Sequence, residues 1–91
     1  GLEMYIKKKD NRLEKFDIEK LERSIKNSAN DIKFELNISD LKLLSNEVIK
    51  KLKLIHEKDS ITNSYEVIGL TIEILKENRF DLIIPSYLNL I

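Results

Sequence analysis

The most constraining feature of the sequence is a change of hydrophobic period at Asp17. Before it, residues 4–9 and 12–16 alternate apolar and polar side chains around Asp10-Asn11, a pair that accepts the positive φ of a two-residue turn. After it, apolar residues recur at helical spacing. The pattern predicts a β-hairpin that leads almost directly into a helix. An isolated hairpin is marginally stable, so this one must pack on helices.

Successive side chains of a strand point to opposite sides, so the lysines of this hairpin cannot all share one face. The face toward the helices is expected to carry Met4, Ile6 and either Leu13 or Phe16. Lysines on an exposed strand commonly serve only to prevent edge-to-edge aggregation, and Lys7 and Lys15 are expected to face solvent in this way. One or two of the three lysines are expected to share a face with Arg12 or Lys15 on the neighbouring strand, which makes a local cationic patch.

Three helices follow, each with a stripe of apolar residues at helical spacing. Asp17 is a good N-cap for the first, which ends near residues 30–31 and has the stripe Ile18, Leu21, Ile25, Ala29 and Ile32. Asn37 or Ser39 caps the second, which ends near His56 and has the stripe Leu41, Leu44, Val48, Leu52 and Ile55. After a polar loop at residues 57–64, Thr62, Asn63 or Ser64 caps the third, which stops at Asn78 and has the stripe Tyr65, Ile68, Ile72 and Leu75.

The tail, residues 80–91, is apolar and predicts a short fourth helix from Asp81, with Pro85 confined to its first turn. The sequence therefore predicts a mainly α protein of the α+β class, in which a small N-terminal β-hairpin packs on a helical bundle in one domain at residues 4–91. Residues 1–3, which precede Met4, are expected to be a cloning remnant.

Length and charge exclude several classes of function. A chain of 91 residues buries one modest core, which excludes a multidomain enzyme. Sixteen basic and sixteen acidic residues cancel, so no overall field favours an anionic membrane, and nucleic acid is an unexpected partner. The absence of cysteine and of any apolar run long enough to cross a membrane is typical of a cytoplasmic protein, which is the expected location.

No catalytic pattern is present in the sequence, and an enzyme is not expected. His56 has no partner with which to bind a metal, and it is expected to face solvent at a helix end or to favour the negative end of the helix dipole. A cluster remains near the hairpin, where Glu14, Asp17 and Lys20 accompany the lysines. Ammonium groups beside carboxylates and aliphatic side chains are what a nucleoside triphosphate requires.

The stretch IKKKDNRLEKFDIEKL, residues 6–21, resembles the opening of the ATP-cone domain, the nucleotide-sensing module of ribonucleotide reductases and of the repressor that controls their genes. The matching positions are Ile6, Lys8, Lys9, Asp10, Asn11, Glu14, Phe16, Asp17, Lys20 and Leu21. Lys9 replaces the usual arginine and keeps its charge without its bidentate fork, and Asn11 replaces the usual glycine. Tyr87 matches a tyrosine of the last helix, whereas Leu90 and Ile91 stand where His, Tyr or Arg is usual.

The resemblance implies a four-helix bundle capped by a small β-sheet, with ATP or dATP as effector between cap and helices. Mg²⁺ can accompany the nucleotide. The implied contacts are phosphates for Lys8, Lys9 and Lys20, adenine or ribose donors for Glu14 and Asp17, the two faces of the base for Ile6 and Leu21, and a cap of the third helix near the ligand for Thr62 or Ser64.

Such a domain does no chemistry but shifts an equilibrium of a regulated partner, here a ribonucleotide reductase, another protein or a second copy of the chain. The sequence leaves open whether the chain is part of a longer protein or acts alone. A second hypothesis is a degenerate ATP-cone that serves as a protein-interaction module without nucleotide, which the apolar tail and its missing basic residues favour.

Overall fold

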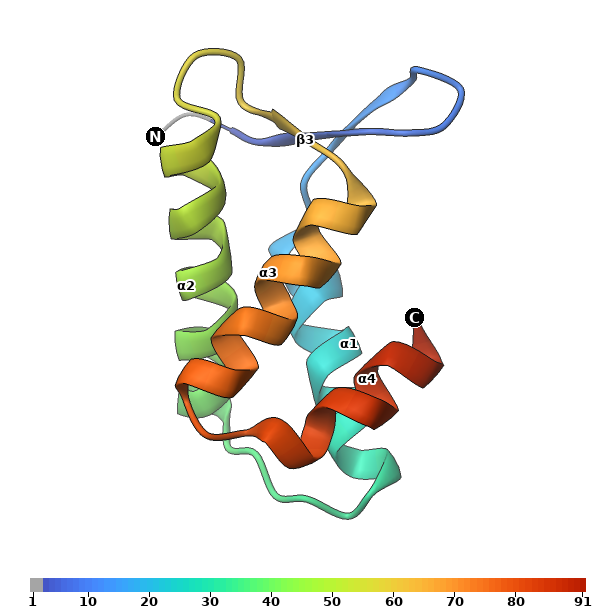
Figure 1. Cartoon of the computed structure of the whole chain (residues 1–91), viewed down its shortest axis with the longest axis vertical. Coiled ribbons are helices and arrows are strands. Elements are labelled where there is room, and N and C mark those ends of the chain that lie inside the picture. The colour runs from blue at the N-terminus through green and yellow to red at the C-terminus, as the bar shows by residue number, and fades with distance from the viewer. Residues whose placement is uncertain (1–2) are drawn as a thin grey trace.

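The computed structural model of the protein describes residues 3–91, and in this part of the chain four α-helices lie beneath a small β-sheet (Figure 1). The elements are β1 (Tyr5–Lys7), β2 (Leu13–Lys15), α1 (Ile18–Asp31), α2 (Ile38–Ile55), β3 (Ile61–Thr62), α3 (Ser64–Glu77), a 3₁₀ turn (Asp81–Ile83) and α4 (Ile84–Leu90). The predicted fold class is confirmed. Of the predicted cloning remnant, residues 1 and 2 lie outside the described residues, whereas Glu3 forms an ion pair with Lys15 at 2.8 Å.

The sheet has three strands in the order β2-β1-β3. β1 pairs antiparallel with β2, which places Ile6 opposite Glu14, and parallel with β3, which places Ile6 opposite Thr62. The prediction that residues 57–64 are only a polar loop was wrong at β3, because a strand of two residues is too short to show a period. The sheet implied by the family resemblance thus gains its third strand from the segment just before α3 (Figure 1).

The hairpin loop is one residue longer than predicted. The N–H of Lys8 donates to the carbonyl of Arg12 at 2.8 Å, and the N–H of Asn11 donates to the carbonyl of Lys8 at 2.9 Å. The loop therefore holds residues 9–11 rather than the predicted pair Asp10-Asn11. Asn11 has a φ of 68°, the left-handed conformation that a three-residue hairpin loop needs at its last position.

The strand register decides which side chains face the helices. Leu13 pairs with Lys7 on the outer face and is 49% exposed, so Phe16 rather than Leu13 joins Met4 and Ile6 on the inner face. Met4 is buried in the core. Lys7 and Lys15 are exposed, as predicted.

The first two helices form where the sequence predicted them. Asp17 caps α1 by accepting hydrogen bonds from the N–H groups of Glu19 and Lys20, and Asn37 caps α2 in a reciprocal capping box with Asp40. The residues of the two stripes that enter the core are Leu21, Ile25, Ala29, Leu41, Leu44, Val48 and Leu52. The last residue of each stripe was placed wrongly: Ile32 is 41% exposed and Ile55 is 55% exposed, because both lie at helix ends that pass beyond the core.

The buried face of α3 differs from the predicted stripe. Of the predicted stripe only Leu75 is fully buried, since Tyr65 is 72% exposed and Ile68 and Ile72 are half-buried. The other buried residues of α3 are Val67, Thr71 and Ile74. Apolar residues occur around most of this helix, so the sequence pattern left its orientation weakly defined. The N-cap is Asn63, which accepts from the N–H of Glu66, and the helix ends at Asn78 as predicted.

The chain ends in a short fourth helix. The expected helix from Asp81 begins as a 3₁₀ turn and continues as α4, with Pro85 in its first turn as predicted. α1 packs against α2 and α4, and α2 packs against α3, which leaves Tyr87 of α4 2% exposed in the core. Within residues 3–91, each helix is too short or too polar to traverse a bilayer.

Candidate functional site

Two adjoining cavities lie where the sheet meets the helices. The inner cavity, of about 360 Å³, is bounded by the hairpin and by α1, α3 and α4, and the outer cavity, of about 1050 Å³, is bounded by the hairpin loop, β3 and the start of α3. Lys8, Ser64 and Ile91 line both cavities. These three residues mark the boundary at which a ligand could extend from one cavity into the other.

All nine residues predicted to bind a ligand line one or both cavities. The inner cavity holds Ile6, Lys8, Glu14, Asp17, Lys20, Leu21 and Ser64. The outer cavity holds Lys8, Lys9, Thr62 and Ser64. Residues that are distant in sequence thus come together because β3 returns to pair with β1, which sets the start of α3 beside the hairpin.

The inner cavity combines an apolar wall with polar groups at its edge. Sequence reasoning named Ile6 and Leu21 but omitted the other apolar residues of the wall, Phe16, Val67, Ile68, Tyr87 and Ile91, and the polar Ser24. Ser24 lies one turn after Leu21 on α1, a spacing that could have indicated it. Val67 and Ile68 of α3 gave no such signal, because the buried face of this helix depends on packing between helices. Tyr87 and Ile91 were indicated only as positions of the family resemblance, without a ligand contact.

Tyr87 forms part of the inner wall and is almost completely buried. Burial raises the pKa of its phenol above the usual value, and the hydroxyl of Thr71 opposes this effect in part. The side chain therefore stays neutral and presents an apolar ring at the junction of α3 and α4.

Glu14 lies between two cations at the boundary of the cavities. Its Oε2 is 3.4 Å from Nζ of Lys8, and its Oε1 is 3.4 Å from a guanidinium nitrogen of Arg12. The sequence prediction assigned Glu14 to ligand donors, and it placed Arg12 only in the possible cationic patch of the hairpin. Because all three side chains are accessible to water, each pair is weak and can be exchanged for a ligand contact.

Asp17 serves first as a helix cap. The N–H groups of Glu19 and Lys20 both donate to its Oδ1, at 3.0 Å and 3.3 Å. The same carboxylate lines the inner cavity, where Oδ2 can accept from a ligand without loss of the cap. Capping also fixes the direction in which Lys20 leaves the first turn of α1.

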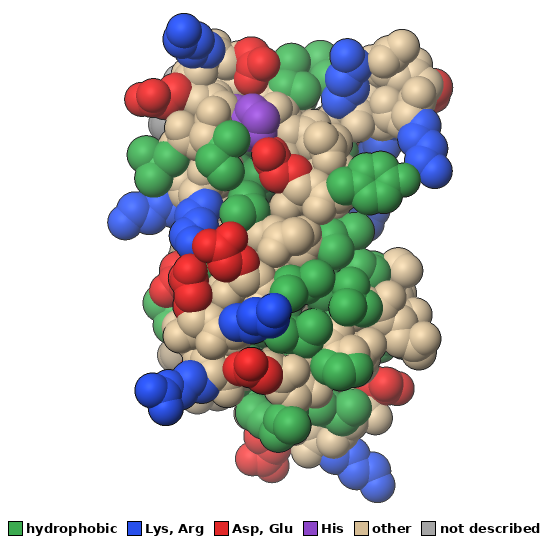
Figure 2. Space-filling view, viewed as in Figure 1, with side chains coloured by type: hydrophobic (Ala, Val, Ile, Leu, Met, Phe, Trp, Pro, Cys, Tyr) green, Lys and Arg blue, Asp and Glu red, His purple; other side chains and the backbone are tan. Residues whose placement is uncertain are grey.

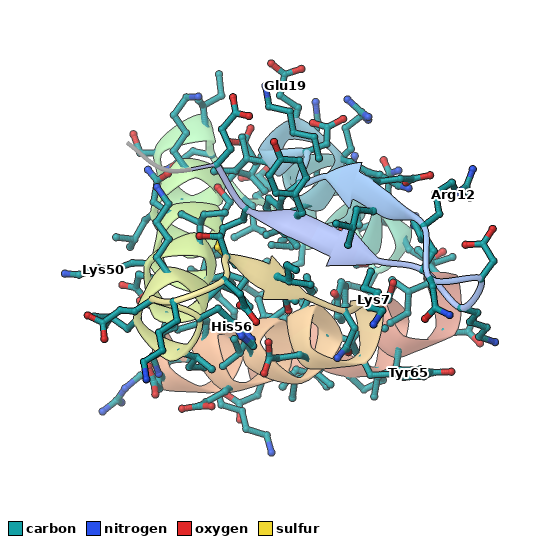
Figure 3. The ribbon with its side chains drawn as sticks, turned by 90° about the horizontal axis from the view of Figure 1, so that it is seen from above. Lys7, Arg12, Glu19, Lys50, His56 and Tyr65 are labelled. Atoms are coloured by element: carbon teal, nitrogen blue, oxygen red, sulfur yellow. The ribbon has the colours of Figure 1, made fainter. Side chains whose placement is uncertain are left out.

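The outer cavity is strongly cationic. Its charged lining consists of Lys7, Lys8, Lys9 and Arg12 with a single acid, Asp10. Lys7 is exposed, as predicted, and it also lines this cavity: Figure 3 shows it on the side of the hairpin that faces the start of α3 and Tyr65. The excess of positive charge favours an anion such as a phosphate chain.

Thr62 is held by a hydrogen-bond network below the outer cavity. It is 2% exposed, and its hydroxyl donates to Oε1 of Glu66 at 2.6 Å. His56 bonds the same oxygen through Nε2, so the expectation that His56 faces solvent was wrong, although it does end α2. Partial burial opposes ionisation of Glu66, but the bonds from Thr62 and His56 outweigh it and hold the pKa of Glu66 below its usual value.

The cap of α3 is neither of the two residues that the family resemblance implied. Asn63 accepts from the N–H of Glu66 at 2.9 Å, whereas Thr62 belongs to β3 and Ser64 is the first helical residue. Thr62 and Ser64 nevertheless flank this cap at the edge of the outer cavity. The exposed N–H groups of a helix start favour negative charge there.

Acidic side chains are sparse in the outer cavity. Residues 3–91 contain no group of three or more histidine and acidic side chains arranged to hold a metal. Asp10 is the one carboxylate of the outer lining. Such a setting suits Mg²⁺ only when phosphate oxygens and water complete its coordination.

Comparison with known proteins gives one match. The family model described as the ATP cone domain matches residues 4–90. No curated protein and no solved structure matches the chain significantly. The match covers every helix and strand described above and every residue that lines the two cavities except Ile91.

Proposed function

This chain belongs to the ATP-cone domain family, and we propose from this premise that it binds ATP or dATP across the inner and outer cavities as a regulatory module. The module carries out no chemistry of its own. The observation that carries the proposal is the gradient of chemistry between the two cavities, from an apolar wall in the inner cavity to four cations in the outer one. A nucleotide has the same gradient, from a flat base to a polyanionic phosphate chain.

The base and sugar are proposed to occupy the inner cavity. Ile6 and Leu21 would flank the adenine, since aliphatic side chains from the sheet and from α1 line this cavity. Glu14 and Asp17 are hydrogen-bond acceptors and would receive the donors of the adenine amino group and the ribose. The cavity volume of about 360 Å³ falls within the range of small-molecule sites.

The phosphates are proposed to extend past Lys8 into the outer cavity. Lys8 and Lys9 would contact them from the hairpin, and Lys20 from the first turn of α1. Thr62 and Ser64 would border the phosphates at the start of α3. Mg²⁺, where it accompanies the nucleotide, would bind phosphate oxygens and neutralise part of their charge, with Asp10 as the nearest protein carboxylate of the outer lining.

The regulatory output is proposed to be a shift in the equilibrium of a partner. ATP and dATP differ only at the ribose 2′ position, so different outputs require a contact that senses this hydroxyl. The partner proposed from family membership is a ribonucleotide reductase, and a second copy of this chain is the other candidate.

Isothermal titration calorimetry with ATP and dATP tests nucleotide binding. We expect saturable binding by the parent protein, and weaker binding by Lys8→Ala and Glu14→Ala. Lys53→Ala is the matched control, because Lys53 is an exposed lysine of α2 that lines neither cavity. Absence of binding up to millimolar nucleotide would contradict the proposal.

A second candidate function, a protein-interaction module without nucleotide, is favoured by exposed apolar side chains near the end of the chain. Leu82 is 71% exposed, and Leu88, Leu90 and Ile91 are about half exposed. Apolar side chains gather over α3 and α4 in Figure 2, whereas charged ones gather over α2. Sedimentation tests this alternative: a strict monomer that binds nucleotide would exclude it.

A further inference from the structure

We propose that Arg12 binds the distal phosphates of the nucleotide, and that the nucleotide displaces Glu14, which otherwise forms an ion pair with the guanidinium of Arg12. This inference rests on the proposed function, because it extends the same site. Arg12 belongs to none of the contacts implied by the family resemblance. Its role follows from where the hairpin loop places it and from the charges around it.

The hairpin fixes the position of Arg12 relative to Lys8. The carbonyl of Arg12 accepts from the N–H of Lys8 at 2.8 Å, so the two residues form the last pair before the loop. The N–H of Arg12 donates to Oδ1 of Asp10 at 3.1 Å, which anchors the loop from its other side. The backbone of Arg12 is therefore held beside the one lysine that lines both cavities.

The charges around Arg12 show what a ligand would replace. Its guanidinium lies 3.4 Å from Glu14 and 3.7 Å from Asp10, and Glu14 also lies 3.4 Å from Lys8. The side chain of Arg12 is 63% exposed, so these pairs are screened by water and are readily exchanged. A phosphate carries more charge than a carboxylate and can displace Glu14 from both cations.

Arg12 also differs chemically from the cations beside it. Among the residues that line the inner and outer cavities, it is the one arginine. A guanidinium binds two phosphate oxygens in a fixed plane, whereas an ammonium acts as a point charge. Arg12 therefore supplies a directional contact where Lys8 and Lys9 supply charge.

The positions of Lys8 and Arg12 along the two cavities determine which phosphates Arg12 can contact. Lys8 stands at the boundary of the two cavities, and Arg12 lines the outer cavity alone. With the base in the inner cavity, the first phosphate meets Lys8 and the later ones reach Arg12. The exchange also frees Glu14 to accept from the base or ribose. The site should therefore favour adenosine di- and triphosphates over the monophosphate.

The test compares the parent protein with Arg12→Ala, Arg12→Lys and Glu14→Gln by calorimetry against ATP, AMP and inorganic tripolyphosphate. Arg79→Ala is the matched control, because Arg79 follows α3 at the end remote from the sheet (Figure 1). Arg12→Ala should weaken ATP and tripolyphosphate about tenfold or more and change AMP by less than about twofold. Arg12→Lys should recover part of the loss. Glu14→Gln should bind tripolyphosphate more tightly than the parent does.

Each outcome separates this inference from the proposed function. If the parent binds ATP and Arg12→Ala binds it equally well, the role of Arg12 is wrong while the nucleotide function stands. Equal weakening of AMP and ATP would likewise exclude a distal-phosphate role. If the parent binds tripolyphosphate in an Arg12-dependent manner but no adenine nucleotide, the anion site stands and the nucleotide function fails. Thermal unfolding of each variant shows whether a loss reflects misfolding.

Discussion

The hydroxyl of Thr62 lies 2.6 Å from Oε1 of Glu66, which is four residues later in the first turn of α3, and His56 bonds the same oxygen. These three residues come from β3, α3 and the end of α2. The carboxylate thus joins the edge strand of the sheet to two helices. Since β3 borders the outer cavity, these hydrogen bonds link that border to α2 and α3.

The first prediction concerns acid unfolding. The folded pKa of Glu66 lies below its usual value of 4.5, so its ionised form stabilises the fold above that pH, and this contribution is lost as the pH falls through the folded pKa. Glu66→Gln should lower the free energy of unfolding by about 1 kcal/mol near neutral pH, and the difference from the parent should shrink below about pH 4. Urea unfolding across this range measures it. Glu57→Gln is the control on an exposed glutamate, and a constant difference at every pH would contradict the prediction.

The second prediction compares two isoleucines of the same predicted stripe. Ile25 is fully buried, whereas Ile32 is 41% exposed beyond the end of α1. Ile25→Ala should cost about 2–5 kcal/mol through lost burial and a cavity, and Ile32→Ala should cost less than about 1 kcal/mol. Denaturant unfolding at constant m-value measures both. Equal losses in the free energy of unfolding for the two variants would contradict the partial exposure of Ile32.

The third prediction separates the two roles of Asp17. Asp17→Ala removes both the N-cap and the carboxylate, and it should cost about 1 kcal/mol of stability as well as weakening ATP binding. Asp17→Ser keeps a capping oxygen, so it should restore most of the stability while ATP affinity stays reduced. Thermal unfolding and calorimetry on the same samples test this. Full recovery of affinity by serine would leave capping as the only role of Asp17.

The fourth prediction concerns the C-terminal side of the cavities. Ile91 lines both cavities, at a position where the family resemblance led us to expect a basic or aromatic residue. Ile91→Arg should strengthen ATP binding severalfold, with a steeper salt dependence, because a cation is added beside the phosphates. Leu54→Arg, on an exposed site of α2, is the control. Unchanged ATP affinity would place the phosphates away from α4.

The parts of the fold that the sequence predicted well depend on local signals. Asp17 and Asn37 cap their helices by hydrogen bonds to residues at most three positions away, so the local sequence determines where these helices begin. The parts missed depend on contacts between distant segments. β3 forms because residues 61–62 pair with β1. The buried face of α3 is determined by the packing of this helix on α2.

The residues of the candidate site also fall into those that local sequence predicted and those that depend on packing between distant segments. The hairpin residues Lys8, Lys9 and Glu14 could be predicted because they occupy matching positions of a sequence motif at residues 6–21. Val67 and Ile68 enter the inner cavity only after α3 has packed, and no local pattern marks them, whereas Tyr87 and Ile91 were indicated only as positions of the family resemblance. Arg12 was predicted only as a possible member of the cationic patch on the hairpin, because the family resemblance implies no ligand contact for it.

The parallel pairing of β1 with β3 predicts an order of folding. The hairpin and each helix close short loops, which form quickly, whereas joining residues 5–6 to residues 61–62 closes a long one and carries a larger entropic cost. The three-stranded sheet forms the roof of the cavities. This roof is therefore expected to be completed late, after α1 and α2 have formed a surface on which it packs. A ligand that spans the hairpin and the start of α3 bridges this last contact, so its binding should slow the opening of the roof more than the unfolding of the helices beneath.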